Sequence, residues 1–368
     1  MIKHLANSAA LVMACSLLAI GIARAGTDGS SAYRSTDFTA VRKYDAHVHA
    51  NTADPAFLAQ AKEDGFELLS INVDYPDFPS IDEQARIAVT LRKSNPRRFH
   101  YATTFSMHDW GTRGWAQGVD TRIDHAVSNG AVGVKIWKNV GLVEKNAAGE
   151  LIMLDDPGLD PVIAHITSLG IPLIDHQGEP FNCWLPLEQM TNDNDRDYFR
   201  EHPQYHMFLH PEQPRYETLM SARDRFVTHH PELRFVGAHM ASLEFDVARL
   251  ASFLDAHPNA NVDLAARMTA VQVQSVRDRE KVRQFFIRFA DRLLYATDLT
   301  YGPEVPPEQF RKEAHAFWIS DWRYLATDES QRIEAIRADV AGLALPRKVI
   351  DKIYYTNAKR QFVRLKPR

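Results

Sequence analysis

Cysteine is scarce in this chain, with two residues among 368, and Cys183 is the only one beyond the first 25 positions. One remaining thiol cannot form an internal disulfide, and a lone cysteine beside Trp184 is more typical of a packed small apolar group. An excess of one charge is also missing, because the formal net charge is -4, and this mild acidity gives no support to nucleic-acid binding. The sequence shows neither an internal repeat nor a low-complexity block, which argues against a solenoid.

The first 25 residues have the pattern of an export signal. Lys3 precedes an apolar stretch from about residue 9 to 23, and a small-x-small cleavage pattern ends at Ala25. This stretch is too short for a convincing membrane span, so we expect cleavage after Ala25 and a periplasmic or secreted protein without a stable membrane span. An uncleaved anchor is the alternative. Residues 26–40 are rich in Ser, Thr and Gly and are expected to form a flexible leader.

Eight short segments have the composition of parallel strands that are buried on both faces. They are mostly apolar and β-branched, and helix-like stretches such as 82–94 and 160–169 separate them. This alternation without a long polar linker predicts one α/β domain over residues 41–368. The expected strands are 42–47, 66–73, 99–105, 131–137, 171–176, 233–239, 260–264 and 293–298.

Potential metal ligands stand where several of these apolar segments end. His47 and His49 are one residue apart, so the period of two in a strand directs both rings the same way. His176, His239 and Asp298 each close a later apolar segment. Together these side chains predict a metal site, although any one histidine among 16 is more often a surface or core residue.

The spacing of these residues predicts a (β/α)8 TIM barrel, in which one strand-helix unit takes roughly 31 residues. From His49 to His176 is 127 residues, close to four units, and from His239 to Asp298 is 59, close to two. From His176 to His239 is 63 residues where one unit is expected. We therefore expect an insertion after the fifth strand, from about residue 178 to 213, that forms a lid or a substrate wall over the barrel mouth.

Four motifs in this order resemble the amidohydrolase superfamily, in the amidohydrolase 2 branch that includes aminocarboxymuconate-semialdehyde decarboxylase. They are Asp-Ala-His-Val-His at 45–49, Val-Gly-Ala-His at 236–239, Tyr-Ala-Thr-Asp at 295–298 and Tyr-Tyr-Thr-Asn-Ala-Lys-Arg at 354–360, and the resemblance covers residues 44–362. It implies a divalent metal, commonly Zn²⁺ and one per chain, held by four residues with His239 beside it as a catalytic group. The implied ligands are His47, His49, His176 and Asp298.

The chemistry expected of such a site follows from the residue types. Imidazole and carboxylate suit zinc, and an open coordination position can hold a water whose pKa falls to about 7. Asp298 could bind the metal and take the proton of the water as general base. His239 could polarise a carbonyl or carry a proton.

Lys135, near the end of the fourth expected strand, has two interpretations. Binuclear members of the superfamily carry a carboxylated lysine at this place, and Lys135 with His239 could then hold a second metal. The favoured interpretation is a lysine that pairs with an acid or binds substrate, because a charged lysine within an apolar strand is costly unless it is paired.

Three residues are candidates for gripping a carboxylate on a small-molecule substrate. Arg267 follows the seventh expected strand, and its guanidinium can bind a carboxylate through two parallel hydrogen bonds. Arg215 and Tyr216 are weaker candidates. A surface ion pair is the competing explanation for the arginines.

The sequence leaves three functions open. The first is an exported hydrolase that acts on a carboxylic ester, lactone or amide through metal-activated water, and export favours it. The second is a metal-dependent, non-oxidative decarboxylase of a small carboxylic acid. The third is a barrel that only binds a ligand, against which the intact ligand positions argue. A homo-oligomer is compatible with all three.

Overall fold

Nine parallel strands form one sheet in the computed structural model, which describes residues 32–362. Their order is β8-β7-β6-β5-β4-β3-β2-β1-β9, so each of the strands β1 to β7 lies beside the next one along the chain, and β9 lies beside β1. The strands are β1 Lys43–Ala50, β2 Phe66–Ile71, β3 Phe99–Thr104, β4 Val134–Ile136, β5 Leu173–Asp175, β6 Phe235–Gly237, β7 Ala260–Asp263, β8 Leu293–Leu294 and β9 Thr300–Tyr301. All eight segments expected from the sequence contain a strand.

The sheet curls so that its last segment meets its first. The amide of Ala46 in β1 donates to the carbonyl of Tyr295, which follows β8, over 2.9 Å, and the amide of Asp298 donates to the carbonyl of His47 over 2.8 Å. β9 then continues beside β1 in a parallel register, with Thr300 opposite His49. The predicted TIM barrel is therefore confirmed, with Asp298 at the interruption between β8 and β9.

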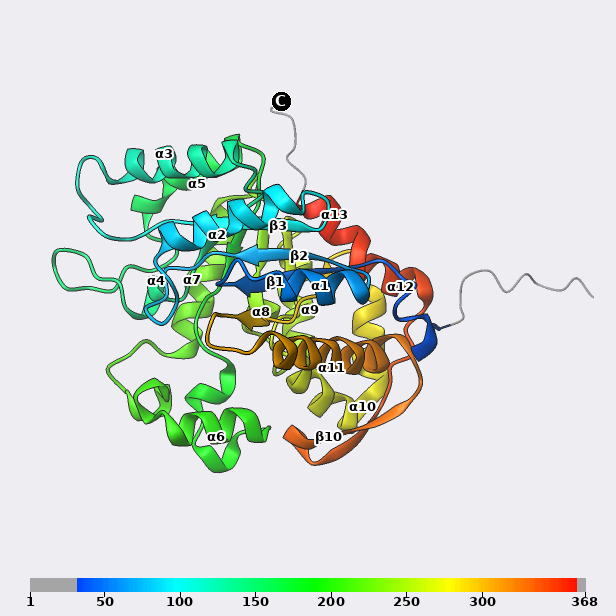
Figure 1. Ribbon diagram of the computed structural model, residues 1–368. Helices are drawn as coiled ribbons and strands as arrows, with labels where there is room; N and C mark the ends of the chain where they lie inside the picture. Colours follow the sequence, from blue (N-terminus) through cyan, green and yellow to red (C-terminus); the bar gives the residue numbers. More distant parts are fainter. Residues whose placement is uncertain (1–31, 363–368) are drawn as a thin grey trace, which may run out of the picture.

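Helices follow the strands and cover the outside of the sheet (Figure 1). Ser80 caps α2 by accepting from the amide of Glu83, the N-cap contact typical of serine. The longer helices are α1 Ala56–Glu63, α2 Ile81–Ser94, α3 Trp115–Ser128, α5 Asp160–Ser168, α7 Tyr216–His229, α9 Val247–Ala256, α10 Met268–Arg288 and α11 Pro307–Ala326. Shorter elements are α4 Asn139–Leu142, α8 Ala238–Ala241, α12 Arg347–Asp351, η8 Lys352–Thr356, α13 Asn357–Gln361 and the hairpin β10 Ser330–Ile333 with β11 Ala338–Ala341.

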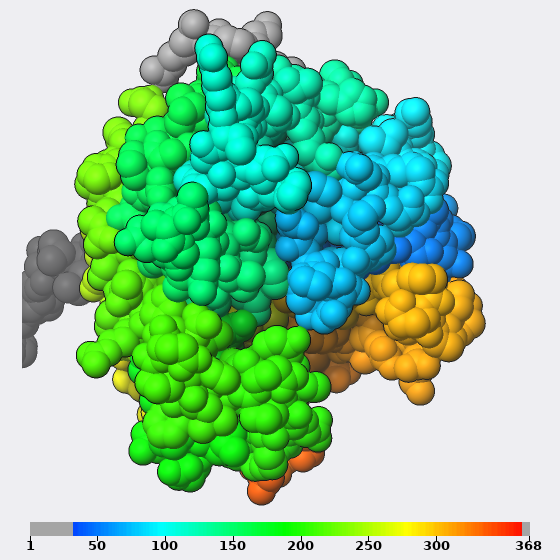
Figure 2. Space-filling view, turned by 90° about the vertical axis from the view of Figure 1, so that its left-hand side faces the viewer, coloured from blue at the N-terminus to red at the C-terminus, as the bar shows by residue number. Residues whose placement is uncertain are grey.

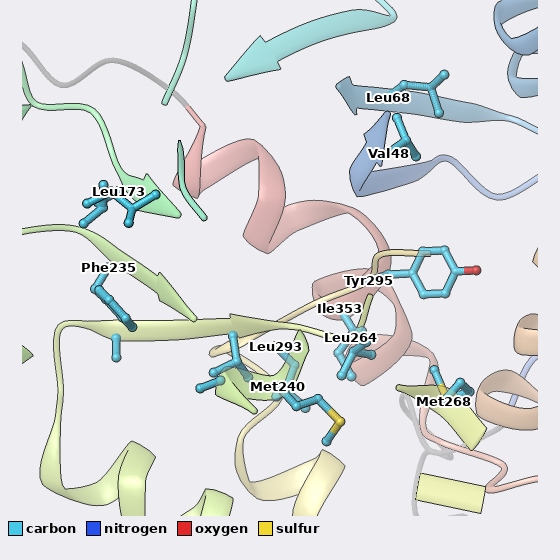
Figure 3. Packing of buried hydrophobic residues seen from close by; sticks show 14 of the residues in the cluster. Val48, Leu68, Leu173, Phe235, Met240, Leu264, Met268, Leu293, Tyr295 and Ile353 are labelled. Atoms are coloured by element: carbon cyan, nitrogen blue, oxygen red, sulfur yellow. The ribbon is translucent and has the colours of Figure 1, made fainter. Parts of the chain in front are cut away.

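Side chains of the strands alternate between two buried clusters. Leu68, Leu173, Phe235 and Leu293 belong to the larger cluster, which fills the space between the sheet and the helices (Figure 3). The residues that follow all four of them, such as Leu69, belong to a smaller inner cluster. This alternation is the period of two expected of a strand, with both faces apolar because both are buried.

A β-bulge in β1 changes which side chains point inward. The register with β2 shifts between Asp45 and Val48. Before the shift, Tyr44 packs in the inner cluster and Asp45 accepts from the indole of Trp318 in α11. After it, His47 and His49 line a cavity at the end of the strand. The bulge therefore turns both histidines into the barrel, a use of bulges seen next to active sites.

The segment between β5 and α7 is the expected insertion. It consists of short helical pieces, η3 Phe181–Trp184, η4 Leu187–Gln189, α6 Asp193–Glu201, η5 Pro203–Tyr205 and η6 Met207–Leu209. Cys183, Met190 and Phe199 give it a small buried cluster of its own, so Cys183 is a packed thiol. The insertion lies on the side of the molecule at which the strands end (Figure 1). Its role as a lid stays a prediction.

Residues 32–40 differ from the flexible leader expected for 26–40. Phe38 is buried, and the indole of Trp322 in α11 donates to the carbonyl of Arg34 over 3.1 Å. The ring of Phe38 packs against those of Phe66, His315 and Trp322. The expected signal peptide, residues 1–25, and residues 26–31 of the leader lie outside the described residues. Within residues 32–362, no helix is long and apolar enough to cross a membrane.

Candidate metal centre

His47 and His49 are held by their Nδ1 atoms, which leaves both Nε2 atoms directed at the same place. His47 Nδ1 lies 2.8 Å from Oδ2 of Asp263 at the end of β7, and His49 Nδ1 lies 2.7 Å from the carbonyl oxygen of Ile71 at the end of β2. A carbonyl oxygen only accepts, so Nδ1 of His49 carries the proton. The carboxylate of Asp263 selects the same tautomer in His47.

Asp298 brings a carboxylate to the two Nε2 atoms. Its Oδ1 lies 3.4 Å from His47 Nε2 and 3.2 Å from His49 Nε2. Asp298 has a left-handed backbone with φ of 71°, which Asp tolerates better than most residues. Burial would raise the pKa of this carboxyl group, but His49, His47 and Lys135 together hold it below its usual value. Asp298 is therefore ionised at neutral pH.

This arrangement fits a metal cation. Two Nε2 lone pairs facing a carboxylate repel one another unless a positive charge lies among them. One ligand atom from each of His47, His49 and Asp298 lies within 4.8 Å of the other two, as ligands of one ion do. Burial lowers the pKa of His47, which keeps the imidazole neutral, as coordination requires.

His176 and His239 stand beside these three residues. Their ring centroids are 4.1 Å apart, and the ring of His239 is 5.0 Å from that of His47. Nε2 of His176 is buried, and no group in residues 32–362 hydrogen-bonds it, so this nitrogen is open to a metal. Burial, followed by nearby cations, holds the pKa of both histidines well below the usual value. His239 Nδ1 donates to the carbonyl of Ala265 over 2.9 Å, which leaves Nε2 as an acceptor.

His239 begins a strained turn of four residues in left-handed backbone conformation. The φ angles run from 53° to 58° over the sequence His239, Met240, Ala241 and Ser242. Without glycine, this conformation costs roughly 1–2 kcal/mol per residue. Asp263 Oδ1 accepts the His239 amide over 2.7 Å, Ser242 Oγ donates to Gln177, and the buried Arg223 donates to the carbonyl of Ala241. These bonds hold the turn and aim the ring of His239.

Lys135 of β4 and Asp175 of β5 are two buried ionisable residues on neighbouring strands. Lys135 Nζ and both carboxylate oxygens of Asp175 lack a hydrogen-bond partner within the described part of the chain. Burial lowers the pKa of Lys135 to about 8 and raises that of Asp175 to about 7. Within the described residues no acid forms an ion pair with Lys135, but Lys135 lines the same cavity as the histidines, so a contact with substrate stays the prediction for it.

The cavity is lined by Lys135 and by all five residues predicted at strand ends, and its volume is about 170 Å³. Arg267 is not among the residues that line this cavity. Its charge lowers the pKa of His176 and His239, which shows that it lies near the cavity.

The structure does not bring Arg215 and Tyr216 to this cavity. Arg215 is exposed at the start of α7, and the buried Tyr216 hydroxyl donates to the carbonyl of Ser242.

Two buried acids that support the site are not among the residues predicted from the sequence. Asp263 anchors both His47 and His239, and Asp45 accepts from the amide and hydroxyl of Thr297 beside Asp298. Burial raises the pKa of Asp45 to about 7. In both cases, an acidic residue within an otherwise apolar strand was the sequence signal that could have identified the residue.

The comparisons with solved structures agree with the fold. An uncharacterised TIM-barrel protein from Bordetella bronchiseptica is similar, with 14% identity and a TM-score of 0.51 over 87% of this chain and 98% of that one. A 2,6-dihydroxybenzoate decarboxylase from Rhizobium is similar at 15% identity with the same TM-score and coverage. No curated protein matches the chain. The Amidohydro_2 family model, described as Amidohydrolase, matches residues 27–363, and the chain therefore belongs to this amidohydrolase family.

Proposed function

We propose that the protein is an exported, metal-dependent hydrolase of a carboxylic ester, lactone or amide, with one Zn²⁺ per chain. His47, His49, His176 and Asp298 would hold the ion. A zinc ion in such a site lowers the pKa of a bound water towards 7 and polarises a carbonyl group. The export proposal rests on the sequence pattern of residues 1–25.

The protonation state of the His239 ring is the observation that favours hydrolysis over decarboxylation. Its single ring proton is committed to the carbonyl of Ala265, and burial keeps the ring neutral. His239 Nε2 is therefore an acceptor, which suits a group that receives a hydrogen bond from the attacking water. Decarboxylation instead requires an acid that delivers a proton to carbon.

Asp298 and His239 both act on the attacking water in this proposal. Asp298 is ionised and 30% exposed towards the cavity, so it can accept the proton of the water. His239 Nε2 can accept a hydrogen bond from the same water and orient it, and the proton held by Asp298 would then go to the leaving group. Lys135 and Arg267 supply positive charge that attracts a substrate with a carboxylate or a developing oxyanion.

A decarboxylase is the second candidate. The fold of the Rhizobium 2,6-dihydroxybenzoate decarboxylase is similar to this one, and the same cavity would hold a small carboxylic acid against the metal. Lys135, with a pKa near 8, would then be the proton donor.

A product assay separates the two candidates. The purified protein with its metal is incubated with a panel of esters, lactones and aromatic acids. The hydrolase releases a new acid and no carbon dioxide. Carbon dioxide from an aromatic acid, with no ester or lactone cleaved, would replace the hydrolase with the decarboxylase.

A further inference from the structure

The metal cavity opens beside a second, larger cavity, and the two share three aromatic residues. The second cavity has a volume of about 450 Å³, and both are lined by Tyr75, Phe78 and Trp137. Tyr75 and Phe78 lie in the loop between β2 and α2, and Trp137 directly follows β4. We call the second cavity the aryl chamber.

An unbroken series of aromatic contacts leads from the metal cluster into the aryl chamber. Phe78 contacts the metal-ligand candidate His49 edge-on at 5.1 Å between ring centroids. Tyr75 lies 5.1 Å from Phe78 and 4.8 Å from Trp137. The Tyr75 hydroxyl donates to Asp77 over 2.6 Å, which fixes the ring. These spacings are those of favourable aromatic pairs, and a flat ring entering the chamber would meet the same surfaces.

The metal cavity alone is small for the site of an organic substrate. A cavity of about 150 Å³ holds a single benzene ring, so the 170 Å³ around the histidines takes the reacting group and little else. Sites for small organic molecules usually measure roughly 300–1,000 Å³, which the metal cavity reaches only together with the aryl chamber.

The two cavities differ in charge. Two lysines, Lys135 and Lys138, line the metal cavity together with the ionised Asp298. Asp74, Asp77 and Glu144 line the aryl chamber, and no lysine or arginine among the described residues does so. The chamber therefore favours an uncharged or cationic group and disfavours a second carboxylate.

The insertion completes the outer wall of the aryl chamber. Tyr205 of η5 lines the chamber together with residues of the barrel loops. Glu179, near the start of the insertion, pairs with Lys138 at the metal cavity. Figure 2 views this face and shows it hollowed where the blue, blue-green and green segments meet.

We propose that the substrate is elongated: its reacting carbonyl or carboxyl end binds at the metal cluster, and an aryl group without negative charge binds in the aryl chamber. Tyr75, Trp137 and Tyr205 then determine specificity. The assignment of the reacting end rests on the proposed function, whereas the chamber itself stands on its lining and charge.

Calorimetry with three related acids tests the chamber without turnover. The probes are 2-naphthoate, 6-(aminomethyl)-2-naphthoate and naphthalene-2,6-dicarboxylate, which differ only in the charge at the far end of the ring. We expect the aminomethyl compound to bind at least tenfold more tightly than the dicarboxylate, with 2-naphthoate between them. Tyr75→Ala should weaken all three by roughly tenfold, and the matched control Phe317→Ala, an exposed aromatic residue of α11, should change none.

A second variant, which removes negative charge from the chamber, provides the test if Tyr75→Ala fails to fold. Asp77→Asn with Glu144→Gln should reduce the preference for the aminomethyl compound to less than threefold. Equal binding of all three acids to the native protein would overturn the chamber, as would a preference that survives the double substitution. Binding in the expected order with no cleavage of any ester refutes only the proposed hydrolase. Ester cleavage together with equal binding of the three acids refutes only the chamber.

Discussion

At the scale of single residues, the position of the proton on each histidine ring determines which nitrogen can bind a metal. Asp263 and the carbonyl of Ile71 each accept from Nδ1 of a histidine, so both Nε2 atoms are left for a metal. The sequence predicts five residues at strand ends, and the structure places all five in one cavity: His47, His49, His176, His239 and Asp298. It does not predict their support, since the pairing of Asp263 with His47 depends on contacts between strands 216 residues apart.

Asp263→Asn should weaken metal binding by about ten- to a hundredfold, the usual effect of removing a carboxylate behind a metal-binding histidine. Competition with a chromogenic chelator measures this affinity. Asp64→Asn is the matched control, because Asp64 is also buried and accepts from the Nδ1 of a histidine, His315, away from the cavity. Equal affinity in both variants would remove Asp263 from the site.

Asp298→Asn should lower turnover by roughly two to four orders of magnitude while most of the metal stays bound. The amide oxygen remains a ligand, but the variant has lost the base that takes a proton from water. Metal content and kcat are measured on the same preparation. Proportional loss of both would show that Asp298 is a ligand without a role as base.

At the scale of elements, strands are easier to predict than the turns that follow them. Apolar runs such as 66–73 mark β2 because buried parallel strands need apolar side chains on both faces. Nothing in Val-Gly-Ala-His predicts that residues 239–242 adopt left-handed backbone, because tertiary hydrogen bonds impose it. Arg223 of α7 is the buried donor to this turn.

Arg223→Met should destabilise the fold by about 1.5–3 kcal/mol, the usual range for a hydrogen bond from a charged group, and should also reduce turnover. The side chain keeps its apolar bulk but no longer holds the carbonyl of Ala241, so His239 loses its fixed direction. Arg225→Met is the control, because Arg225 lies on the same helix in an exposed ion pair with Asp155. Chemical denaturation gives the stability of each variant, and kcat is measured on the same preparations. A loss of stability in Arg223→Met with unchanged kcat would contradict this role.

At the scale of the whole molecule, Glu67 ties the start of the barrel to its end. The carboxylate, in β2, accepts from His100 in β3 and from Tyr355 and Lys359 near the C-terminus. Burial alone would raise the pKa of Glu67, but these hydrogen bonds lower it to about 2. Residue spacing predicts the number of strands, but it does not predict this cross-link, which joins residues 292 positions apart.

The pH dependence of unfolding checks this cross-link. Since the folded pKa of about 2 lies below the unfolded value of about 4.3, Glu67 contributes stability above pH 4.3 and loses it as the pH falls towards 2. The contribution is at most about 3 kcal/mol. Glu67→Gln should therefore lower the free energy of unfolding at pH 7 and flatten its decline between pH 4.3 and 2. An unchanged decline would contradict the cross-link.

Metal content of the double variant His47→Ala/His49→Ala tests the proposed centre most directly. The native protein, purified without chelator, is predicted to contain one divalent metal per chain by elemental analysis. The double variant should contain less than about a tenth of that and should show no turnover, whereas His257→Ala, which removes a buried histidine outside the cavity, should keep both. Full metal occupancy in the folded double variant would contradict the site.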